Sequence, residues 1–448
     1  MSWRKVKLGE ICTIEKGAIG IQKAIPGEYP LVVTGEDRKS HNEYQFDCEA
    51  VIIPLVSGTG HGHASIKRIH FQSGKFALGN ILCAVIPKET KQLKTEYLFR
   101  FLELNKENEL VARMKGMANV TLPIKEIAQI EIPLPPIKEQ ADFVEMYKDM
   151  ETKSSLLSTE LSHQLTLVKK LRQQLLQDAV QGKLVPQNAK DEPASELLKK
   201  IKAEKEKLIA EKKLKKEKEL PPIKPEDLLA GMTRIPFEIP ENWVWCRLGE
   251  ICTKIGSGST PKGSNYSTIG KPFFRSQNIY DSGLVYDDIK FISDDVHKQM
   301  NGTTVYANDI LLNITGGSMG RCVLVPTNFE EGNVSQHVCI IRPLLVDNNF
   351  YHSVTLSPFF QRFIFSSTTG AGREGLPKYN LEQFIIPLPP LEEQNRIVQK
   401  LDELMQYCNE LEASIKQVEL QNEKLLQQVL REALSQPAGR AGGETAGV

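Results

Sequence analysis

Several features that would assign a function are missing from this sequence of 448 residues. No apolar stretch approaches the roughly 20 residues that a membrane-spanning helix needs. The first residues, MSWRKVKLGE, lack the apolar segment of a signal peptide, so we expect a cytoplasmic protein with no membrane contact. The eight cysteines include no Cys-x-x-Cys pair, and no histidines stand at zinc-finger spacing. Reduced, mostly buried thiols are therefore predicted.

The sequence motifs of common catalytic sites are also missing. No Gly-x-x-x-x-Gly-Lys-Ser/Thr loop is found, and the glycine-rich stretch at 256–260 lacks the lysine that a phosphate-binding loop needs. No Asn/Asp-Pro-Pro-Tyr/Phe stretch indicates an amino-methyltransferase. His61 and His63 are metal-binding types, but no third ligand is nearby, and a polar loop is the simpler interpretation. We predict no catalytic residue, no metal site and no cofactor in this chain.

The formal net charge is zero, which counts mildly against nucleic-acid binding. The charge is uneven, however. Residues 60–120 hold ten Lys and Arg against five Asp and Glu, while the corresponding part of the second half is near neutral. Charge alone does not predict a function.

An internal repeat organises the chain. The six residues Leu8–Thr13, LGEICT, recur unchanged as Leu248–Thr253, 240 positions later. The five residues Ile132–Pro136, IPLPP, recur as Ile386–Pro390, 254 positions later. Each half therefore opens and closes alike, and a duplication is predicted in which the second copy holds 14 extra residues.

Each copy begins with a region that reads as α+β. Runs such as Ala50–Val56, Phe76–Ile86, Asp309–Ile314 and Val338–Arg342 are apolar or β-branched and are bounded by Gly, Pro and Asn. They indicate short strands joined by turns. Helical patterns follow near 95–115 and 351–366. A compact domain of mixed strands and helices is predicted in each half.

A long helix is predicted after each Pro-Leu-Pro-Pro stop, because proline cannot continue a helix but can precede one. Residues 138–180 and 392–434 contain neither Pro nor Gly. Apolar residues recur by three and four, which is a heptad pattern and predicts that the two helices pack as an antiparallel, coiled-coil-like pair with pseudo-twofold symmetry. The predicted seam consists of Leu157, Leu161, Gln164, Val168, Leu171 and Leu175 with Leu411, Ile415, Val418, Asn422, Leu425 and Val429.

The segment between the copies is strongly charged. Residues 199–219 hold ten Lys and five Glu with few apolar residues. This composition is typical of a solvated helix or a flexible tether, with a DNA or partner contact as the other interpretation. The last residues, 437–448, are rich in Gly and Ala and are expected to be disordered.

In this doubled order the motifs resemble those of type I restriction-modification specificity subunits. Residues 387–394, PLPPLEEQ, match the closing phrase of that family's domains, and residues 133–140, PLPPIKEQ, depart from it conservatively. The opening Trp and Leu-Gly-Glu-Ile are similar to the family's domain start. Asp309-Ile310-Leu311 followed by Gly316 and Gly320, then Gln336-His337, resembles a further recurrent stretch.

The resemblance implies a division of the chain into six parts. These are a first target recognition domain at 1–136, a first spacer helix at 137–182, a charged linker at 183–240, a second target recognition domain at 241–390, a second spacer helix at 391–436 and the tail at 437–448.

The resemblance further implies a non-catalytic subunit that reads double-stranded DNA at a split, asymmetric target. The helices would dock two modification subunits, and up to two restriction subunits would join. Those partners would use S-adenosylmethionine, ATP and Mg. Because the two domains differ in length and sequence, two different half-sites are expected.

Polar loop residues are the candidates for DNA contact, because Arg, Lys, Asn, Gln, Ser and Thr suit both phosphates and base edges. In the first domain they are Arg38, Lys39, Ser57, Thr59, His61, His63, Lys67, Arg68, Lys115, Asn119 and Thr121. In the second they are Arg275, Gln277, Asn278, Thr315, Ser318, Arg321, Gln336, His337, Arg373 and Lys378.

Two other functions remain open. One is a DNA-binding scaffold or regulator that has no methylase or nuclease partner. The other is an enzyme with an unrecognised site in one domain. Co-purification of a methyltransferase separates the first from a specificity subunit, and catalysis by the isolated chain would support the second.

Overall fold

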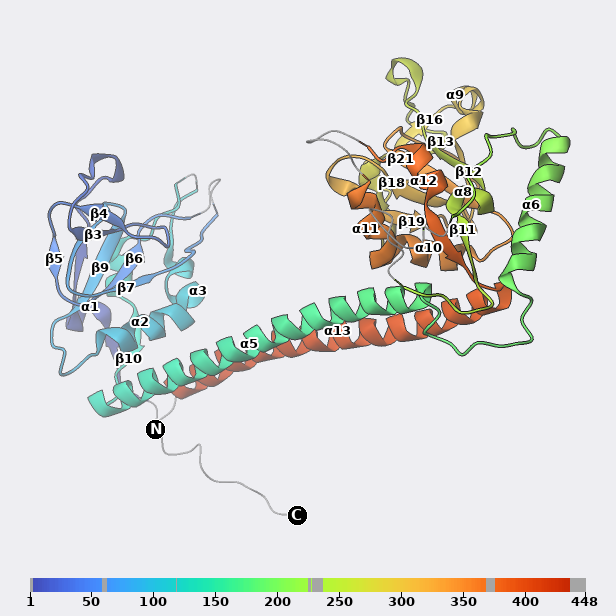
Figure 1. Ribbon diagram of the computed structural model, residues 1–448. Helices are drawn as coiled ribbons and strands as arrows, with labels where there is room; N and C mark the ends of the chain where they lie inside the picture. The colour runs from blue at the N-terminus through green and yellow to red at the C-terminus, as the bar shows by residue number, and fades with distance from the viewer. Residues whose placement is uncertain are drawn as a thin grey trace, which may run out of the picture. The chain divides into compact units, whose positions relative to one another are not determined.

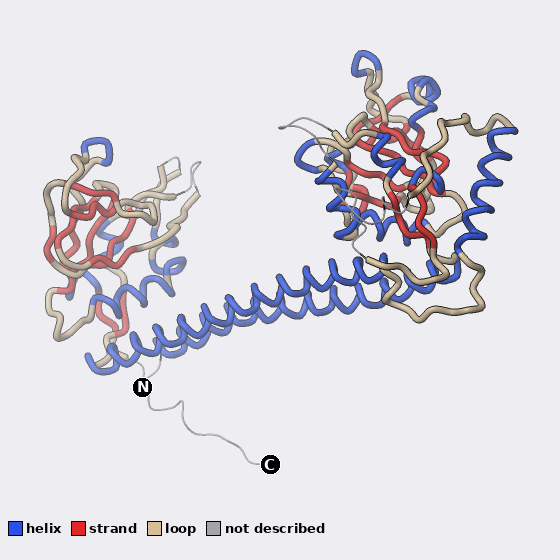
Figure 2. Tube along the Cα trace, viewed as in Figure 1, coloured by secondary structure: helices blue, strands red, loops and turns tan. Residues whose placement is uncertain are grey.

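The computed structural model describes residues 3–58, 63–117, 119–224, 227, 237–367 and 375–435. The chain divides into two compact units, one made of Met1–His163 with Ile415–Val448 and the other of Gln164–Ser414. Each unit contains one domain of mixed strands and helices, which we call the first head and the second head, and a part of each long helix (Figures 1 and 2).

The first head is built on two four-stranded sheets. The antiparallel sheet has the strand order β2 (Cys12–Lys16), β9 (Leu82–Pro87), β6 (Ala50–Pro54), β7 (His70–Gln72). The mixed sheet has the order β4 (Lys39–His41), β3 (Tyr29–Val32), β8 (Lys75–Leu78), β5 (Phe46–Asp47), with β3 and β8 parallel. A further pair, β1 (Lys5–Lys7) with β10 (Glu131–Pro133), joins the start of the head to its end.

The second head repeats this topology strand for strand. Its antiparallel sheet has the order β12 (Cys252–Ser257), β21 (Val338–Pro343), β18 (Ile310–Asn313), β19 (Cys322–Leu324). Its mixed sheet has the order β16 (Lys290–Ile292), β13 (Lys271–Phe274), β20 (Glu331–Val334), β17 (Thr304–Tyr306), again with one parallel pair, β13 and β20. The closing pair is β11 (Val244–Arg247) with β22 (Ile385–Leu388), and β14 (Ile279–Tyr280) with β15 (Gly283–Leu284) is an addition. The duplication predicted from the sequence is therefore also present in the fold, because the two heads share one strand order.

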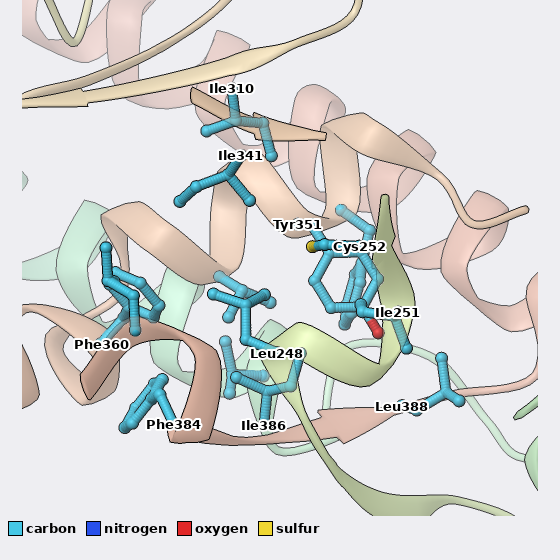
Figure 3. Close-up of a cluster of buried hydrophobic side chains, with 14 of the residues drawn as sticks. Leu248, Ile251, Cys252, Ile310, Ile341, Tyr351, Phe360, Phe384, Ile386 and Leu388 are labelled. Atoms are coloured by element: carbon cyan, nitrogen blue, oxygen red, sulfur yellow. The ribbon is translucent and has the colours of Figure 1, made fainter. Parts of the chain in front are cut away.

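Both faces of each antiparallel sheet are covered, which explains why the strands read as continuous apolar runs. In β18, Ile310 and Leu312 belong to the core formed with helices, whereas Leu311 between them faces the mixed sheet. Figure 3 shows Ile310 and Ile341 on the helix side together with Tyr351 and Phe360. The helices that supply this layer are α8 (Leu248–Ile251), α10 (Asn348–Leu356), α11 (Pro358–Ser366) and α12 (Lys378–Gln383).

The first head has the corresponding helices, in the order α1 (Leu8–Ile11), α2 (Thr95–Leu104), α3 (Lys106–Glu109) and α4 (Ile124–Ala128). The second head also has α9 (Asp294–Gln299). The two long helices are α5 (Ile137–Val180) and α13 (Leu391–Ser435).

The repeated closing phrase joins each head rigidly to its long helix. Gln140 is fully buried and accepts a hydrogen bond from the Lys94 backbone N–H just before α2, while its amide donates to the carbonyls of Gln92 and Pro135. Gln394 does the same in the second head, accepting from the Asp347 backbone N–H and donating to the Pro389 carbonyl. The glutamine of the phrase is thus a structural residue in both copies.

Contacts between the long helices are found within each unit. In the first unit, Asn422 Nδ2 donates to Ser154 Oγ at 2.8 Å, and Leu430 shares a core with Phe143. In the second unit, Arg172 Nη2 lies 3.1 Å from Glu412 Oε2. Leu401 belongs there to the core that also holds Leu176.

The predicted seam was only partly right. Leu161, Val168 and Ile415 are buried, and Gln164, Leu175, Asn422 and Val429 are half-buried. Five other members are more than a third exposed: Leu157, Leu171, Leu411, Val418 and Leu425. The neighbouring positions are half-buried in their place, among them Ser158, Arg172, Glu412, Glu419 and Leu426. Both flanks of a heptad stripe satisfy the same periodicity, so the pattern did not distinguish the packed flank from the exposed one.

Part of the charged linker is a helix, as one interpretation of its composition predicted, but this helix is not a free tether. It is α6 (Ala194–Ala210), whose Ala194, Leu197 and Ile201 are buried in the core of the second unit. The Lys205 ammonium donates to the carbonyls of Gly249 at 2.7 Å and Glu250 at 3.4 Å, at the end of the repeated Leu-Gly-Glu-Ile turn.

The first unit satisfies the same two carbonyls with a different lysine. Lys88 Nζ donates to the carbonyls of Gly9 at 3.3 Å and Glu10 at 2.9 Å. The second copy has Leu344 after the corresponding Pro343, and the linker supplies the missing cation. Helix α6 of the linker is therefore packed as a part of the second unit.

We expect Lys205→Met to lower the unfolding free energy of the second unit by about 1–2 kcal/mol, because it removes charge-assisted hydrogen bonds to two carbonyls. Urea unfolding followed by tryptophan fluorescence measures this, since Trp243 and Trp245 both lie in β11 or next to it. Lys199→Met, at an exposed ion pair of the same helix, is the control and should change stability by less than about 0.5 kcal/mol. Equal effects of the two variants would contradict the assignment.

Candidate nucleic-acid interface

The candidate residues of the first head gather where strands end at one edge. The C-terminal ends of β2 and β6 and the N-terminal ends of β9 and β7 meet there, because neighbouring strands are antiparallel. Ser57, His63, Lys67 and Arg68 all lie on the connection from β6 to β7. We call the loops at these strand ends the candidate edge of each head.

Two further segments reach the same edge. Strand β3 is parallel to β8 and ends beside the turn into β9, so Arg38 follows it at this edge. The segment with Lys115, Asn119 and Thr121 joins through Thr121, which bridges to Val56 and to Lys115. Candidates from three separate stretches of sequence are thus brought together.

The second head places its candidates on the equivalent connections. Thr315, Ser318 and Arg321 lie between β18 and β19, and Gln336 and His337 lie between β20 and β21. Thr315 Oγ1 and His337 Nδ1 are 2.7 Å apart, which ties the two connections together. Arg275 and Gln277 follow β13, as Arg38 follows β3.

A glycine at the equivalent position of each copy allows two backbone segments to approach each other closely at this edge. A Cβ on Gly17 would stand 2.2 Å from the Gly79 carbonyl oxygen, and one on Gly258 would stand 1.9 Å from that of Val334. Gly17 donates to the Leu82 carbonyl and Gly258 to that of Val338. The glycine-rich stretch at 256–260 is explained by this close approach of two backbones.

The cations of the first head differ in how far they are neutralised. Arg68 pairs with Glu36 at 2.8 Å and Lys115 with Glu126 at 2.6 Å. Lys39 and Lys67 have no ion pair with any residue that the structure describes. These two exposed lysines are therefore not neutralised by any described acidic residue.

Arg38 is held by neutral groups. Its Nε donates to Gln72 Oε1 at 3.1 Å, and its Nη1 lies 3.2 Å from His70 Nδ1. Burial, together with the charge of Arg38, lowers the pKa of His70 to about 4. The imidazole is therefore neutral at pH 7 and accepts from Arg38, whose positive charge is left for an external anion.

The second head neutralises Arg275, whereas the half-buried Arg321 has no ion pair with any residue that the structure describes. Arg275 Nη2 lies 2.9 Å from Asp288 Oδ2, to which Gln277 also donates. Hydrogen bonds from Arg275 and Lys290 lower the pKa of Asp288 to about 2. The Arg321 guanidinium instead stacks 4.6 Å from the centre of the Tyr280 ring, an arrangement that orients the charge without cancelling it.

Two candidates have partners within the protein, and one of them is buried. Asn278 is fully buried, and its amide donates to the carbonyls of Val285 and Asp287, so it holds a loop and cannot reach DNA. Lys378 pairs with Glu217 at 2.8 Å and Glu382 at 2.9 Å, so it links the linker segment to α12. Three further candidates, Thr59, His61 and Arg373, lie outside the described residues.

Two residues of the edge were missed by the sequence analysis. Tyr280 orients Arg321, and Thr260 Oγ1 donates to Gln336 Oε1. No sequence pattern marks either residue, because each acts through a partner that is distant in sequence. Thr260 ends the glycine-rich stretch, which was considered only as a phosphate-binding loop.

The sequence matches a family described as the type I restriction modification DNA specificity domain, over residues 1–167 and 240–420. The chain belongs to this family. The two matched ranges contain the two heads, and each extends into the long helix that follows its head.

Individual relatives agree with this membership. The type I restriction enzyme EcoAI specificity subunit of Escherichia coli is 35% identical over 272 residues, which are 58% of this chain and 43% of that subunit. The EcoEI specificity subunit of Escherichia coli is 34% identical over 55% of this chain and 40% of its own length. The match thus spans less than half of the length of both relatives. The EcoDI specificity subunit is 24% identical over 97% of this chain and 88% of its own length.

A solved structure has the same fold. A chain described in work on complex assembly and conformational transition of the type I R-M system superposes with a TM-score of 0.55 at 18% identity, covering 97% of each chain. No helix in the described parts of this chain combines the length and apolar content that a membrane span requires. Within those same parts, no group of three or more His, Cys, Asp and Glu side chains is placed to hold a metal ion.

Proposed function

We propose that this chain is the non-catalytic subunit that recognises a split, asymmetric DNA target for a type I restriction-modification complex. The observation that carries the proposal is the pair of heads with one topology and different polar side chains at the same strand ends. The first head presents Lys39, Lys67 and Arg38 there, and the second presents Arg321, Thr315 and His337. Equivalent scaffolds with different donors suit two different half-sites.

We further propose that α5 and α13 form an antiparallel, coiled-coil-like pair with pseudo-twofold symmetry, which sets the spacing of the half-sites. The Ser154–Asn422 and Arg172–Glu412 contacts support it, since the first joins the N-terminal half of α5 to the C-terminal half of α13 and the second joins the other halves. At about 1.5 Å per residue, a helix of 44 residues is about 66 Å long. Such a helix is long enough to separate two DNA-binding domains.

The exposed flank of the heptads is the proposed docking surface for modification subunits. Leu157 and Leu171 on α5 correspond, 254 positions on, to Leu411 and Leu425 on α13. Rows of exposed leucines are costly in water and suit burial against a partner helix. Because the row is repeated in the two copies, we propose two modification subunits per chain and up to two restriction subunits beyond them.

The partners, not this chain, would supply the chemistry, using S-adenosylmethionine for methylation and ATP with Mg for translocation and cleavage.

Mapping the methylated bases in DNA modified by the assembled complex tests the whole proposal. Two different half-sites at one fixed spacing would support it, and a palindromic target would contradict it. Co-purification without any methyltransferase would favour a DNA-binding scaffold or regulator.

We expect exchange of residues 1–136 for the same segment of another family member to change one half-site and leave the other half-site and the spacer unchanged. The reason is that the first head has its own two sheets and core. Methylation mapping of the chimaera measures the outcome, with the reciprocal exchange of the second head as the control. A change in both half-sites would refute independent reading by the two heads.

A further inference from the structure

A surface cavity of about 460 Å³ lies in the second unit between α5 and α11. It is lined by three cations, Lys169, Lys170 and Arg362, and by three glutamines, Gln173, Gln174 and Gln177. None of the lining residues is acidic, and the three cations have no ion pair with any residue that the structure describes. The cavity therefore concentrates positive charge and amide donors.

Gln177 is an unusual member of this lining. Its side chain is only 8% exposed, yet neither its amide nitrogen nor its amide oxygen has a hydrogen-bond partner among the described residues. Buried polar groups in native proteins are nearly always paired, so an unpaired one calls for an explanation. A bound group with oxygen acceptors would satisfy the amide nitrogen.

The first unit has different side chains at the positions that correspond to the cavity lining, although the duplication gives it the corresponding helices. Positions 254 residues on from Lys169 and Gln177 are Glu423 and Arg431, and Asn108 is the counterpart of Arg362. Arg431 is exposed and its Nη2 donates to the Leu104 carbonyl at 3.4 Å, so this position holds no buried, unpaired amide like that of Gln177. The residues that make the cavity positive are therefore not repeated at the described counterpart positions of the first unit, and the symmetry of the fold does not require them.

The cavity shares α11 with the candidate edge of the second head. Gln361, the neighbour of Arg362, donates from Nε2 to the Gly320 carbonyl at 2.9 Å. Gly320 belongs to the connection that also carries Ser318 and Arg321. One helix, about 10–12 Å across, thus separates the candidate base-reading loop from the cavity.

We propose that this cavity binds backbone phosphates of DNA beside the half-site that the second head reads. The inference rests on the proposed function and extends it to a contact outside the strand-end loops. Lysine, arginine, glutamine and threonine are the side chains that contact phosphates without reading sequence. The shared helix favours DNA over an acidic segment of a partner protein, because DNA at the candidate edge passes next to α11. The contact adds affinity on one side of the asymmetric target and carries no specificity.

The triple variant Lys169→Gln, Lys170→Gln, Arg362→Gln tests the proposal in the full chain purified with its partner subunits. All three side chains are exposed, so folding should be retained, and circular dichroism checks this. Binding to a random-sequence duplex is measured by fluorescence anisotropy from low to moderate salt. The slope of log K against log salt should fall by about 0.9 for each phosphate that the variant no longer neutralises, which is roughly eightfold in Kd per phosphate at 0.1 M salt. The methylated sequence should stay the same.

Lys424→Gln is the matched control, because it occupies the position equivalent to Lys170 in the first unit, next to Glu423. It should leave the slope within error of the unmodified protein, and Lys169→Arg with Lys170→Arg should keep the full slope. An unchanged slope in the triple variant would overturn the proposal. Loss of a partner subunit with unchanged DNA binding would also overturn it, in favour of an acidic protein ligand. Failure of the unmodified complex to bind any duplex would refute the proposed function instead.

Discussion

Asp309→Ala should lower the unfolding free energy of the second unit by about 3–5 kcal/mol, the largest effect that we expect from a single side chain here. Asp309 is 1% exposed and accepts from Arg342 at both oxygens, at 2.6 and 2.7 Å. It also accepts from the Tyr306 backbone N–H at 2.8 Å. Its removal leaves a partly buried guanidinium and a backbone donor without their acceptor. Urea unfolding followed by tryptophan fluorescence measures the loss.

The first head supplies the control for this prediction. The strand registers make Ala50 the counterpart of Asp309 and Ile86 the counterpart of Arg342. Ala50 is fully buried, and Ile86 packs against the same core. Replacing both members of a buried ion pair by apolar residues is often close to neutral. We therefore expect Asp309→Ala with Arg342→Ile to recover more than half of the loss, and a double variant as unstable as the single one would contradict this account.

This pair also gives a structural role to the Asp309-Ile310-Leu311 stretch of the second copy. The Asp of Asp309-Ile310-Leu311 fixes the start of β18 against the end of β21, and the two apolar residues then enter opposite cores. The motif is therefore structural, although it stands next to loops proposed to contact DNA. The first copy has a looser form of this motif because the apolar residues Ala50 and Ile86 stand where the second copy has the Asp309–Arg342 ion pair.

The sequence predicted the elements that depend on local patterns and repetition. The runs at 50–56 and 309–314 contain β6 and β18, and the Pro-Leu-Pro-Pro stops precede α5 and α13. Buried strands covered on both faces need no alternation, so their apolar runs were readable. The repeat located the two heads because both heads have the same fold, so the residues that form it recur in the second copy.

What the sequence could not predict depends on tertiary partners. The lysine-rich linker looked solvated because ten of the residues in its charged stretch are Lys, yet three apolar residues on one face of α6 and the single ammonium of Lys205 attach it to the second head. Asn278 has the composition of a DNA-contact residue, and only its burial shows otherwise. The partner of Arg321, Tyr280, is 41 positions away. Polar loop residues carry no local signal that separates an exposed donor from a buried one.

Gln164→Pro should abolish assembly with modification subunits and lower the affinity for the split target by about 10²–10⁴. Proline inside a helix removes a backbone hydrogen bond and collides with the preceding turn, at about 3 kcal/mol or more. Residue 164 lies near the middle of α5, where the first unit ends and the second begins. A kink there would change the separation of the heads, and the affinity gained from two linked binding modules is lost when they cannot engage together.

The contrast with Gln164→Ala identifies the cause. Alanine favours helix, so that variant should keep both assembly and affinity. Co-purification measures assembly, and anisotropy with the mapped target against each half-site alone measures the linkage. If the heads read independently, the proline variant should bind single half-sites as the unmodified chain does and lose only the advantage of having both.

Retained assembly by the proline variant would refute helical docking. Retained affinity for the full target, with assembly lost, would show that α5 serves partner binding and does not set the spacing. The length of α5 favours a role in spacing, because a helix of 44 residues exceeds what either head needs to bury its own core.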